Sequence, residues 1–168
     1  MKLRPAGPRD LPALRALHLA SWRAHYAGLF PEDFLAHAAP VELDALWTAE
    51  RLQSHLVPVA EDAGGLAGFA ACDPGDAEGP FVDNIHVHAS RLGQGVGRAL
   101  MGWLAQTLRA RGQDSIWLLV LDGNCAARAA YARLGGVEGP PQTFEVMGQP
   151  VLERPVRWPT LAPLLAPC

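Results

Sequence analysis

The sequence predicts an α+β (mixed α/β) fold built on one central sheet. Two strand-and-helix pairs follow each other between residues 81 and 134, which predicts two parallel strands joined by a right-handed crossover. Earlier in the chain, two strand patterns flank Asp62-Ala63-Gly64-Gly65, a turn that predicts an antiparallel hairpin. The chain has 168 residues, of which 49% are apolar and 18% are charged. That length and balance predict a single domain over residues 1–168 with a sizeable core.

The first part of the chain predicts a short strand, three helical stretches and the hairpin. Leu14, Leu17 and Trp22 recur at helical spacing, so a first helix is expected from Asp10 to about residue 26. The other expected elements are a strand at 3–4, helices at 32–37 and 41–52, and hairpin strands at 56–61 and 66–72.

The second part predicts alternating strands and helices. Asn124 is a good N-cap for a helix, and the apolar run at 115–121 is typical of a strand buried on both faces. The expected elements are a loop at 73–80, strands at 81–87 and 115–121, helices at 95–111 and 124–134, and late strands at 143–147 and 151–158 joined at Gly148-Gln149. The proline-rich tail at 159–168 is expected to lie on the surface.

Composition argues against several function classes. The net charge of −3 gives no polycationic surface, so we expect no nucleic-acid partner. The longest strongly apolar run is six residues and the start lacks a secretory signal, so no membrane partner is expected. Cys72, Cys125 and Cys168 form no disulfide framework, and no residues have metal-ligand spacing. We therefore expect a metal-free protein of the reducing cytoplasm.

Charge is distributed unevenly along the chain. Residues 32–83 hold eleven acidic residues and one basic residue, whereas 1–31 and 84–168 are each net basic. No acid lies between Asp83 and Asp114, a stretch that contains four arginines. These charges are either scattered and solvated, or they form a basic patch for an anionic ligand beside an acidic lobe for a cationic one. Composition leaves both interpretations open.

A glycine-rich loop, Arg91-Leu92-Gly93-Gln94-Gly95-Val96-Gly97-Arg98, connects an expected strand to an expected helix. Glycine lets the backbone approach a ligand closely, and a helix N-terminus offers N–H groups and the positive end of its dipole. Phosphate or pyrophosphate is the natural occupant, and a tight turn without a ligand is the alternative. The alternating glycines do not match Gly-x-Gly-x-x-Gly, and the only lysine, Lys2, lies too early for a Gly-Lys-Ser/Thr phosphate loop.

Three segments resemble the GNAT superfamily of N-acetyltransferases. Ile85-His86-Val87, followed by the run from Leu92 to Leu100, is similar to its acetyl-CoA-binding signature. The run from Asn124 through Tyr131 to Gly135 is similar to its second signature, and residues 21–35 are similar to the amino-terminal segment of many bacterial members. The resemblance implies a GNAT-like single domain, whose central sheet is mostly antiparallel with a splayed parallel strand pair and flanking helices.

The resemblance also implies an acetyl-CoA site. By similarity, the backbone of Ile85, His86 and Val87 pairs with the pantetheine arm like an added strand, Asn124 meets the cofactor, and Tyr131 stands near its sulfur. Positions 124 and 131 are two helical turns apart and share one helix face. The pyrophosphate is then cradled by the amides of Gly93, Gln94, Gly95, Val96, Gly97 and Arg98.

The chain departs from the family pattern at two positions. Leu92 stands where the family's loop usually begins with Gln or Arg, and Arg91 is one residue earlier, so we expect weaker side-chain support for the pyrophosphate. Leu119 stands where some members carry a glutamate as general base, so that base is missing.

The remaining candidates concern proton transfer and the acceptor. Asp83 and His86 lie on opposite faces of the strand beside the cofactor, and either is a candidate base, with ordinary polar contacts or direct transfer to water as alternatives. By the same resemblance, Tyr131 is the expected donor to the leaving thiolate, with packing on the buried face of a short helix as its alternative. Trp22 and Tyr26, at i and i+4, are candidates for the acceptor pocket or for the core of the first helix. Cys125, at a helix start without a nearby histidine, is not expected to be a nucleophile.

Together these observations predict an N-acetyltransferase that moves an acetyl group from acetyl-CoA to a primary amine by direct transfer in a ternary complex. The expected acceptor is a small-molecule or peptide amine, and a homodimer stays open as an assembly. Two other classes stay open. One is a non-catalytic CoA-binding or regulatory module on the same scaffold, and the other is a nucleotide-binding protein that uses the glycine loop.

Overall fold

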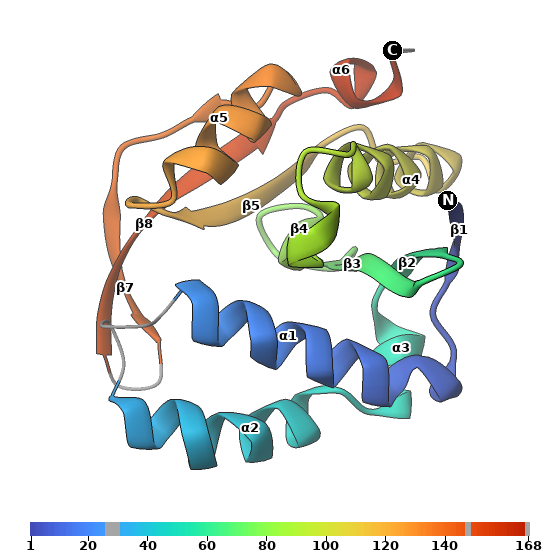
Figure 1. Cartoon of the computed structure of the whole chain (residues 1–168). Coiled ribbons are helices and arrows are strands. Elements are labelled where there is room, and N and C mark those ends of the chain that lie inside the picture. Colours follow the sequence, from blue (N-terminus) through green and yellow to red (C-terminus); the bar gives the residue numbers. More distant parts are fainter. Residues whose placement is uncertain (26–30, 147–148, 167–168) are drawn as a thin grey trace. The chain divides into compact units, whose positions relative to one another are not determined.

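The computed structural model describes residues 1–25, 31–146 and 149–166, with its elements labelled in Figure 1. The chain divides into a first unit, residues 1–71 and 84–100, and a second unit, residues 72–83 and 101–168. Within the described residues, eight strands hydrogen-bond in the order β1-β2-β3-β4-β5-β8-β6, and β7 pairs with β8. All described pairings except β4 with β5 are antiparallel, as the sequence predicts.

The first unit contains the predicted hairpin. β2 (Pro58–Asp62) and β3 (Gly65–Asp73) pair antiparallel, and β1 (Lys2–Pro5) pairs with the other side of β2. Gly65 closes the turn with a φ of 101°, a left-handed conformation that favours glycine. The predicted strands and turn are therefore confirmed to within two residues at each end.

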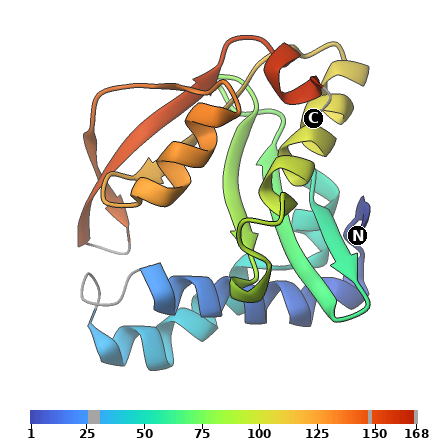
Figure 2. The ribbon, with the colours of Figure 1, turned by 45° about the horizontal axis from the view of Figure 1, so that its top comes forward.

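Two helical segments cover the core of the first unit. α1 (Leu11–His25) and α2 (Ala39–Leu46) lie side by side in both views (Figure 1, Figure 2). The apolar stripe of α1 packs with α2 and the hairpin into one cluster, which consists of Leu14, Leu17, Leu43, Trp47, Val57, Val59, Phe69 and Ala71. The periodicity of the first helix thus predicts its buried face correctly.

The helix boundaries between residues 32 and 54 differ from the prediction. A helix that starts at Glu32 passes through a π-helical turn, Phe34–Ala38, directly into α2, where a break was expected. The wide turn, closed by Ala39 N–H on the Phe34 carbonyl, accommodates Pro40, which has no N–H to donate. The break falls at Trp47, which is buried and has an extended backbone, and Thr48 then caps α3 (Ala49–Ser54).

β4 (Phe81–Val87) and α4 (Val96–Ala110) flank the glycine loop, with a 3₁₀ turn at Ala89–Arg91 between them. Gly68 of β3 allows β4 and the start of α4 to approach it closely. A Cβ at Gly68 would lie 2.8 Å from both the His86 carbonyl oxygen and Val96 Cγ1. The backbone near the loop is therefore held by a position that tolerates no side chain.

In the second unit, β5 (Ile116–Leu121) pairs in parallel with β4 through Phe81–Trp117 and Val82–Leu118, and antiparallel with β8 (Gln149–Trp158). The prediction that β5 is buried on both faces is wrong, because its residues alternate between buried and partly exposed. The second face carries Trp117, which stacks on Phe81 at 4.3 Å and lies under the Arg157 guanidinium at 4.7 Å. Phe81 and Arg157 therefore cover part of the second face of β5, which explains why this face is apolar without being fully buried.

The rest of the second unit comprises α5 (Cys125–Arg133), β6 (Val137–Glu138), β7 (Gln142–Val146) and α6 (Ala162–Leu165). The two-residue β6 and the four-residue α6 were not predicted, because such short elements leave no periodic pattern. The expectation of a surface tail at 159–168 holds in part for the described residues: Pro159, Thr160, Ala162 and Ala166 are exposed, whereas Leu161 and Leu164 are buried. No helix within residues 1–25, 31–146 or 149–166 is long and apolar enough to cross a membrane.

Candidate functional site

The glycine loop of the first unit has an open backbone. Gly93 and Gly95 have φ angles of 74° and 79°, so both use the left-handed region that glycine favours. A Cβ at either position would meet no atom within 4 Å. The loop leads directly into α4, where Ala99 N–H donates to the Gly95 carbonyl at 3.0 Å, so the first amides of the helix point toward the loop without helical partners. This geometry suits a phosphate group.

Arg91 anchors the loop to the hairpin turn. Its Nε and Nη2 donate to the two Asp62 carboxylate oxygens at 2.8 and 3.2 Å. Hydrogen bonds from Arg91 and from the Gly64 amide hold the pKa of Asp62 below its usual range, so this carboxylate stays charged. In the sequence, Arg91 lies one residue before the position where the family usually has a basic residue. In the structure, its guanidinium binds the Asp62 carboxylate.

His86 of β4 lies in a ring of polar and aromatic side chains within the first unit. Its Nδ1 is 2.8 Å from the Ser21 hydroxyl, and its Nε2 is 3.4 Å from the Asn84 amide oxygen. Since the amide oxygen only accepts, Nε2 donates to it. The imidazole stacks on His18 with ring centroids 4.3 Å apart. Its neighbours Ile85 and Val87 are likewise partly buried, whereas Asp83, which belongs to the second unit, is exposed.

Of the two predicted acceptor-pocket residues, the structure describes only one. Trp22 is partly buried, meets the His18 ring edge-on at 5.1 Å and packs against the core cluster. It therefore lies beside the histidine pair and also contributes to packing. Tyr26 falls outside the described residues.

Asn124 and Tyr131 belong to the second unit and sit at the two ends of α5. Asn124 caps the helix as predicted, because its Oδ1 accepts from the Ala127 amide at 3.1 Å, which leaves its NH₂ group as the donor for other contacts. The Tyr131 ring packs edge-on against Trp158 at 6.0 Å. Burial raises the pKa of Tyr131 to about 12, so the hydroxyl keeps its proton at neutral pH.

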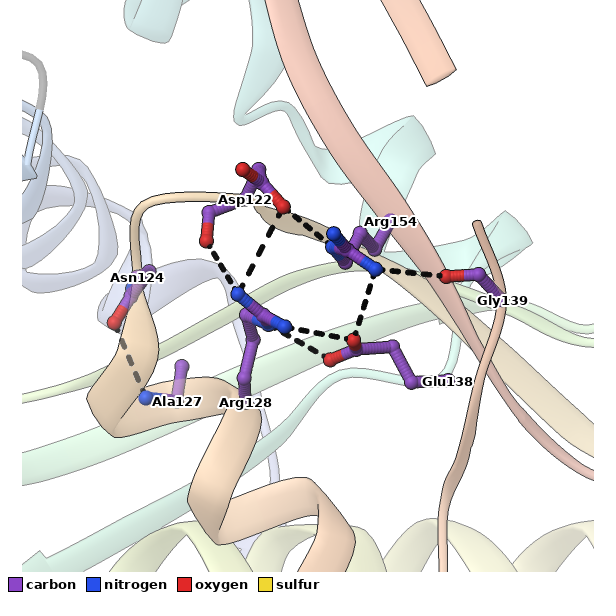
Figure 3. Close-up of polar contacts among 7 residues, drawn as sticks. All are labelled: Asp122, Asn124, Ala127, Arg128, Glu138, Gly139 and Arg154. Carbon is purple, nitrogen blue, oxygen red and sulfur yellow. Dashed lines mark hydrogen bonds and ion pairs between the residues drawn. The ribbon is translucent and has the colours of Figure 1, made fainter. Parts of the chain in front are cut away.

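Four charged side chains surround the start of α5, and sequence analysis did not single them out. Asp122, Arg128, Glu138 and Arg154 form a closed network that joins the end of β5 to α5, β6 and β8 (Figure 3). The pairs are separated by between 6 and 32 residues in the chain, so no local spacing marks them. The one local feature in the sequence that could have drawn attention to this network is an arginine, Arg128, near the start of a helix with a good N-cap.

Comparisons with known proteins agree with this architecture. The family model described as "Acetyltransferase (GNAT) family" matches residues 14–136. An uncharacterized N-acetyltransferase, YuaI, of Bacillus subtilis is 27% identical over 96% of this chain and 95% of its own. Streptothricin acetyltransferase of Streptomyces lavendulae is 38% identical over 43% of this chain and 39% of its own.

Solved structures give the same result. A GCN5-related N-acetyltransferase structure from Rhodopseudomonas palustris superposes with a TM-score of 0.75 and 26% identity, covering 93% of each chain. The structure of YncA from Salmonella typhimurium, solved with acetyl-CoA, superposes with a TM-score of 0.71 and 20% identity, covering 96% of this chain and 94% of its own. The family match spans most of the chain and includes both the glycine loop before α4 and the capped α5. This chain therefore belongs to the acetyltransferase (GNAT) family.

Proposed function

We propose that the protein is an N-acetyltransferase that moves the acetyl group of acetyl-CoA directly to a primary amine in a ternary complex. The observation that carries the proposal is the loop at Gly93 and Gly95, whose left-handed backbone and empty Cβ positions precede the N-terminus of α4. Membership of the GNAT family supports it. So does the YncA structure, which was solved with acetyl-CoA.

The proposal assigns the co-substrate to named groups. Amides of residues 93–98 bind the pyrophosphate, because a helix N-terminus and adjacent glycine amides favour negative charge. The backbone of Ile85, His86 and Val87 binds the pantetheine arm, and an amide there stabilises the oxyanion that forms on the thioester carbonyl. Asn124 donates its NH₂ group to the co-substrate.

The chemical step needs two protons removed from the protonated amine and one supplied to the departing thiolate. An amine is mostly protonated at neutral pH and attacks only after losing a proton. We assign that proton to Nδ1 of His86, the ring nitrogen that carries no proton, by way of the Ser21 hydroxyl that donates to it. The exposed Asp83 is the alternative base. The amine nitrogen then forms the new C–N bond, the C–S bond breaks, and Tyr131 protonates the departing thiolate. The second proton, which the nitrogen loses as it becomes a neutral amide, passes through water to Tyr131 and restores its hydroxyl.

A thiol-release assay with acetyl-CoA and a panel of amines tests the proposal. We expect CoA release that depends on the amine, together with CoA binding by calorimetry and none for ATP or NAD. Binding of CoA without release in the presence of any amine would favour the non-catalytic module, which the leucine at position 119 in place of a glutamate keeps as the competing function. Binding of ATP in preference to CoA would overturn both.

A further inference from the structure

Arg128 makes the most extensive contacts of the charged network around the start of α5 (Figure 3). Its Nε and Nη2 donate to the two Glu138 carboxylate oxygens, both at 2.8 Å, which is a two-pronged arginine–carboxylate pair. Its third nitrogen, Nη1, donates to the backbone carbonyl of Asp122 at 2.8 Å. One guanidinium thus links α5 to β6 and to the residue that follows β5.

The second arginine completes the network from β8. Arg154 Nε pairs with the Asp122 carboxylate, and its Nη1 lies 3.2 Å from Glu138 Oε1. The arginine contacts hold the pKa of both Asp122 and Glu138 below their usual ranges, so two negative and two positive charges balance at neutral pH. Because these charges compensate one another, the network is suited to fixing elements and not to binding an anion.

The Asp122 carbonyl that Arg128 engages lies two residues before the cap of α5. Asn124 follows it through a turn closed by Asn124 N–H on the Leu121 carbonyl at 2.9 Å. The same α5 carries Tyr131, one turn beyond Arg128. The guanidinium therefore fixes the position at which the helix bearing both predicted functional residues begins.

We propose that Arg128 is a positioning residue for acetyl transfer, which sets α5 so that Asn124 and Tyr131 are correctly oriented. The inference rests on the proposed function of Tyr131 as proton donor. A lysine at position 128 would keep the charge, but its single nitrogen could not reproduce the two-pronged pair with Glu138 together with the hydrogen bond to the Asp122 carbonyl. Small displacements of a catalytic group cost much of the rate, up to about a hundredfold for a shift of ~1 Å.

The test compares Arg128→Lys with Arg109→Lys in the full chain. Arg109 makes one exposed ion pair with Asp114 at 3.1 Å in the same unit, so its replacement controls for the loss of an arginine pair. We expect Arg128→Lys to lower kcat about tenfold or more, with a much smaller change in KM for acetyl-CoA. We expect Arg109→Lys to match the wild type. A folded Arg128→Lys enzyme with kcat within about twofold of wild type would overturn the inference.

A double-mutant cycle separates positioning from simple stabilisation. If Arg128 acts through Tyr131, Arg128→Lys should reduce kcat less in a Tyr131→Phe background than in the wild type. An equal reduction in both backgrounds would contradict the inference. Should Arg128→Lys not fold, Glu138→Gln weakens the same two-pronged pair by changing the carboxylate. It should likewise reduce kcat less in the Tyr131→Phe background than in the wild type. If Tyr131→Phe alone leaves kcat unchanged, the proposed role of Tyr131 fails instead.

Amide hydrogen exchange tests the inference without any substrate or activity assay. Asn124 protects the Ala127 amide, so faster hydrogen exchange at the start of α5 is expected in Arg128→Lys and not in Arg109→Lys. Unchanged exchange at that amide would show that Arg128 does not fix the helix start, and it would overturn the inference whatever the activity of the enzyme.

Discussion

Trp47 donates its indole N–H to Nδ1 of His18, with the two nitrogens 3.0 Å apart. Because the indole nitrogen can only donate, Nδ1 of His18 must accept and cannot carry a proton. The proton of this neutral imidazole is therefore on Nε2. His18 is buried, with 2% of its surface exposed, and this burial, helped by the charge of Arg51, lowers its pKa from 6.5 to about 3.

This relationship predicts how stability depends on pH. Between pH 6.5 and about 3, the unfolded chain protonates His18 and the folded protein does not. The unfolded state thus binds more protons, so the free energy of unfolding falls as the pH falls, with a slope from this group of up to about 1.4 kcal/mol per pH unit. The slope from His18 fades as the pH rises above 6.5, because the unfolded chain then loses this proton as well.

Urea unfolding from neutral pH down to about pH 5 measures this slope before most carboxylates titrate. His18→Gln keeps an acceptor for the Trp47 indole and removes the titrating group, so its curve should be flatter than that of the wild type. His88→Gln, at an exposed histidine, is the matched control and should keep the wild-type slope. Parallel curves for wild type and His18→Gln would contradict the prediction.

The pairing of Trp47 with His18 also shows where sequence analysis reached its limit. The helical stripe of α1 could be predicted, because the periodicity of Leu14 and Leu17 is local. The partner of His18 could not, because Trp47 lies 29 residues further along the chain, at a helix break that was not predicted. The boundary error at residues 46–49 and the missed buried pair have the same cause, since both depend on where the Trp47 ring packs.

In the candidate site, too, the features with a local sequence pattern could be predicted and the long-range contacts could not. The glycine loop and the Asn124 cap were predictable, because helix ends and left-handed glycines have short sequence signatures. The network of Asp122, Arg128, Glu138 and Arg154 was not, since ion pairs form between residues that only the folded sheet brings together. The same applies to Asp62 holding Arg91 across 29 residues.

If the glycine loop binds the pyrophosphate, the affinity for CoA should depend on the size and charge of the side chain introduced at Gly97. A Cβ at this position would lie 3.9 Å from Val87 Cγ2, an ordinary contact, so Gly97→Ala should fold and bind CoA. Gly97→Asp adds a negative charge where the pyrophosphate is proposed to bind and should raise the Kd for CoA at least tenfold, which corresponds to about 1.4 kcal/mol. Gly97→Asn has the same size without the charge and should fall between them. Calorimetry on the three folded variants gives the order, and equal affinities would rule out a phosphate at this loop.

Tyr131 is predicted to act in the chemical step. With its pKa raised to about 12, the hydroxyl is a protonated donor throughout the neutral range. Tyr131→Phe keeps the ring that packs against Trp158 and removes only this donor, so folding and CoA affinity should be retained. We expect kcat to fall about a hundredfold, the lower end of general acid catalysis. Steady-state kinetics with a true acceptor, beside calorimetry with CoA, would expose a purely structural role as an unchanged kcat.

The last prediction concerns the charge of the acceptor. In the first unit, Asp62 pairs with Arg91 and Glu61 shares Arg4 with Asp10, so most of the net negative charge of residues 32–71 comes from helix carboxylates that the structure leaves exposed. These carboxylates are Glu32, Asp33, Glu42, Asp44 and Glu50, of which Asp33 and Asp44 also contact His37 and Arg15. An acidic surface attracts cations and repels carboxylates within about 8 Å at physiological salt.

We therefore expect kcat/KM to be higher for a basic peptide or polyamine-like acceptor than for an acidic amine, and the difference to shrink as salt is added, because exposed charges are screened. Neutralising Glu42 and Glu50 with glutamine should reduce the preference in low salt, whereas Glu145→Gln, an exposed acid in the second unit, should leave it unchanged. If the preference is set by contacts in the acceptor pocket and not by steering, salt and the helix substitutions will leave it intact. A preference for the acidic amine would show that these carboxylates serve solubility alone.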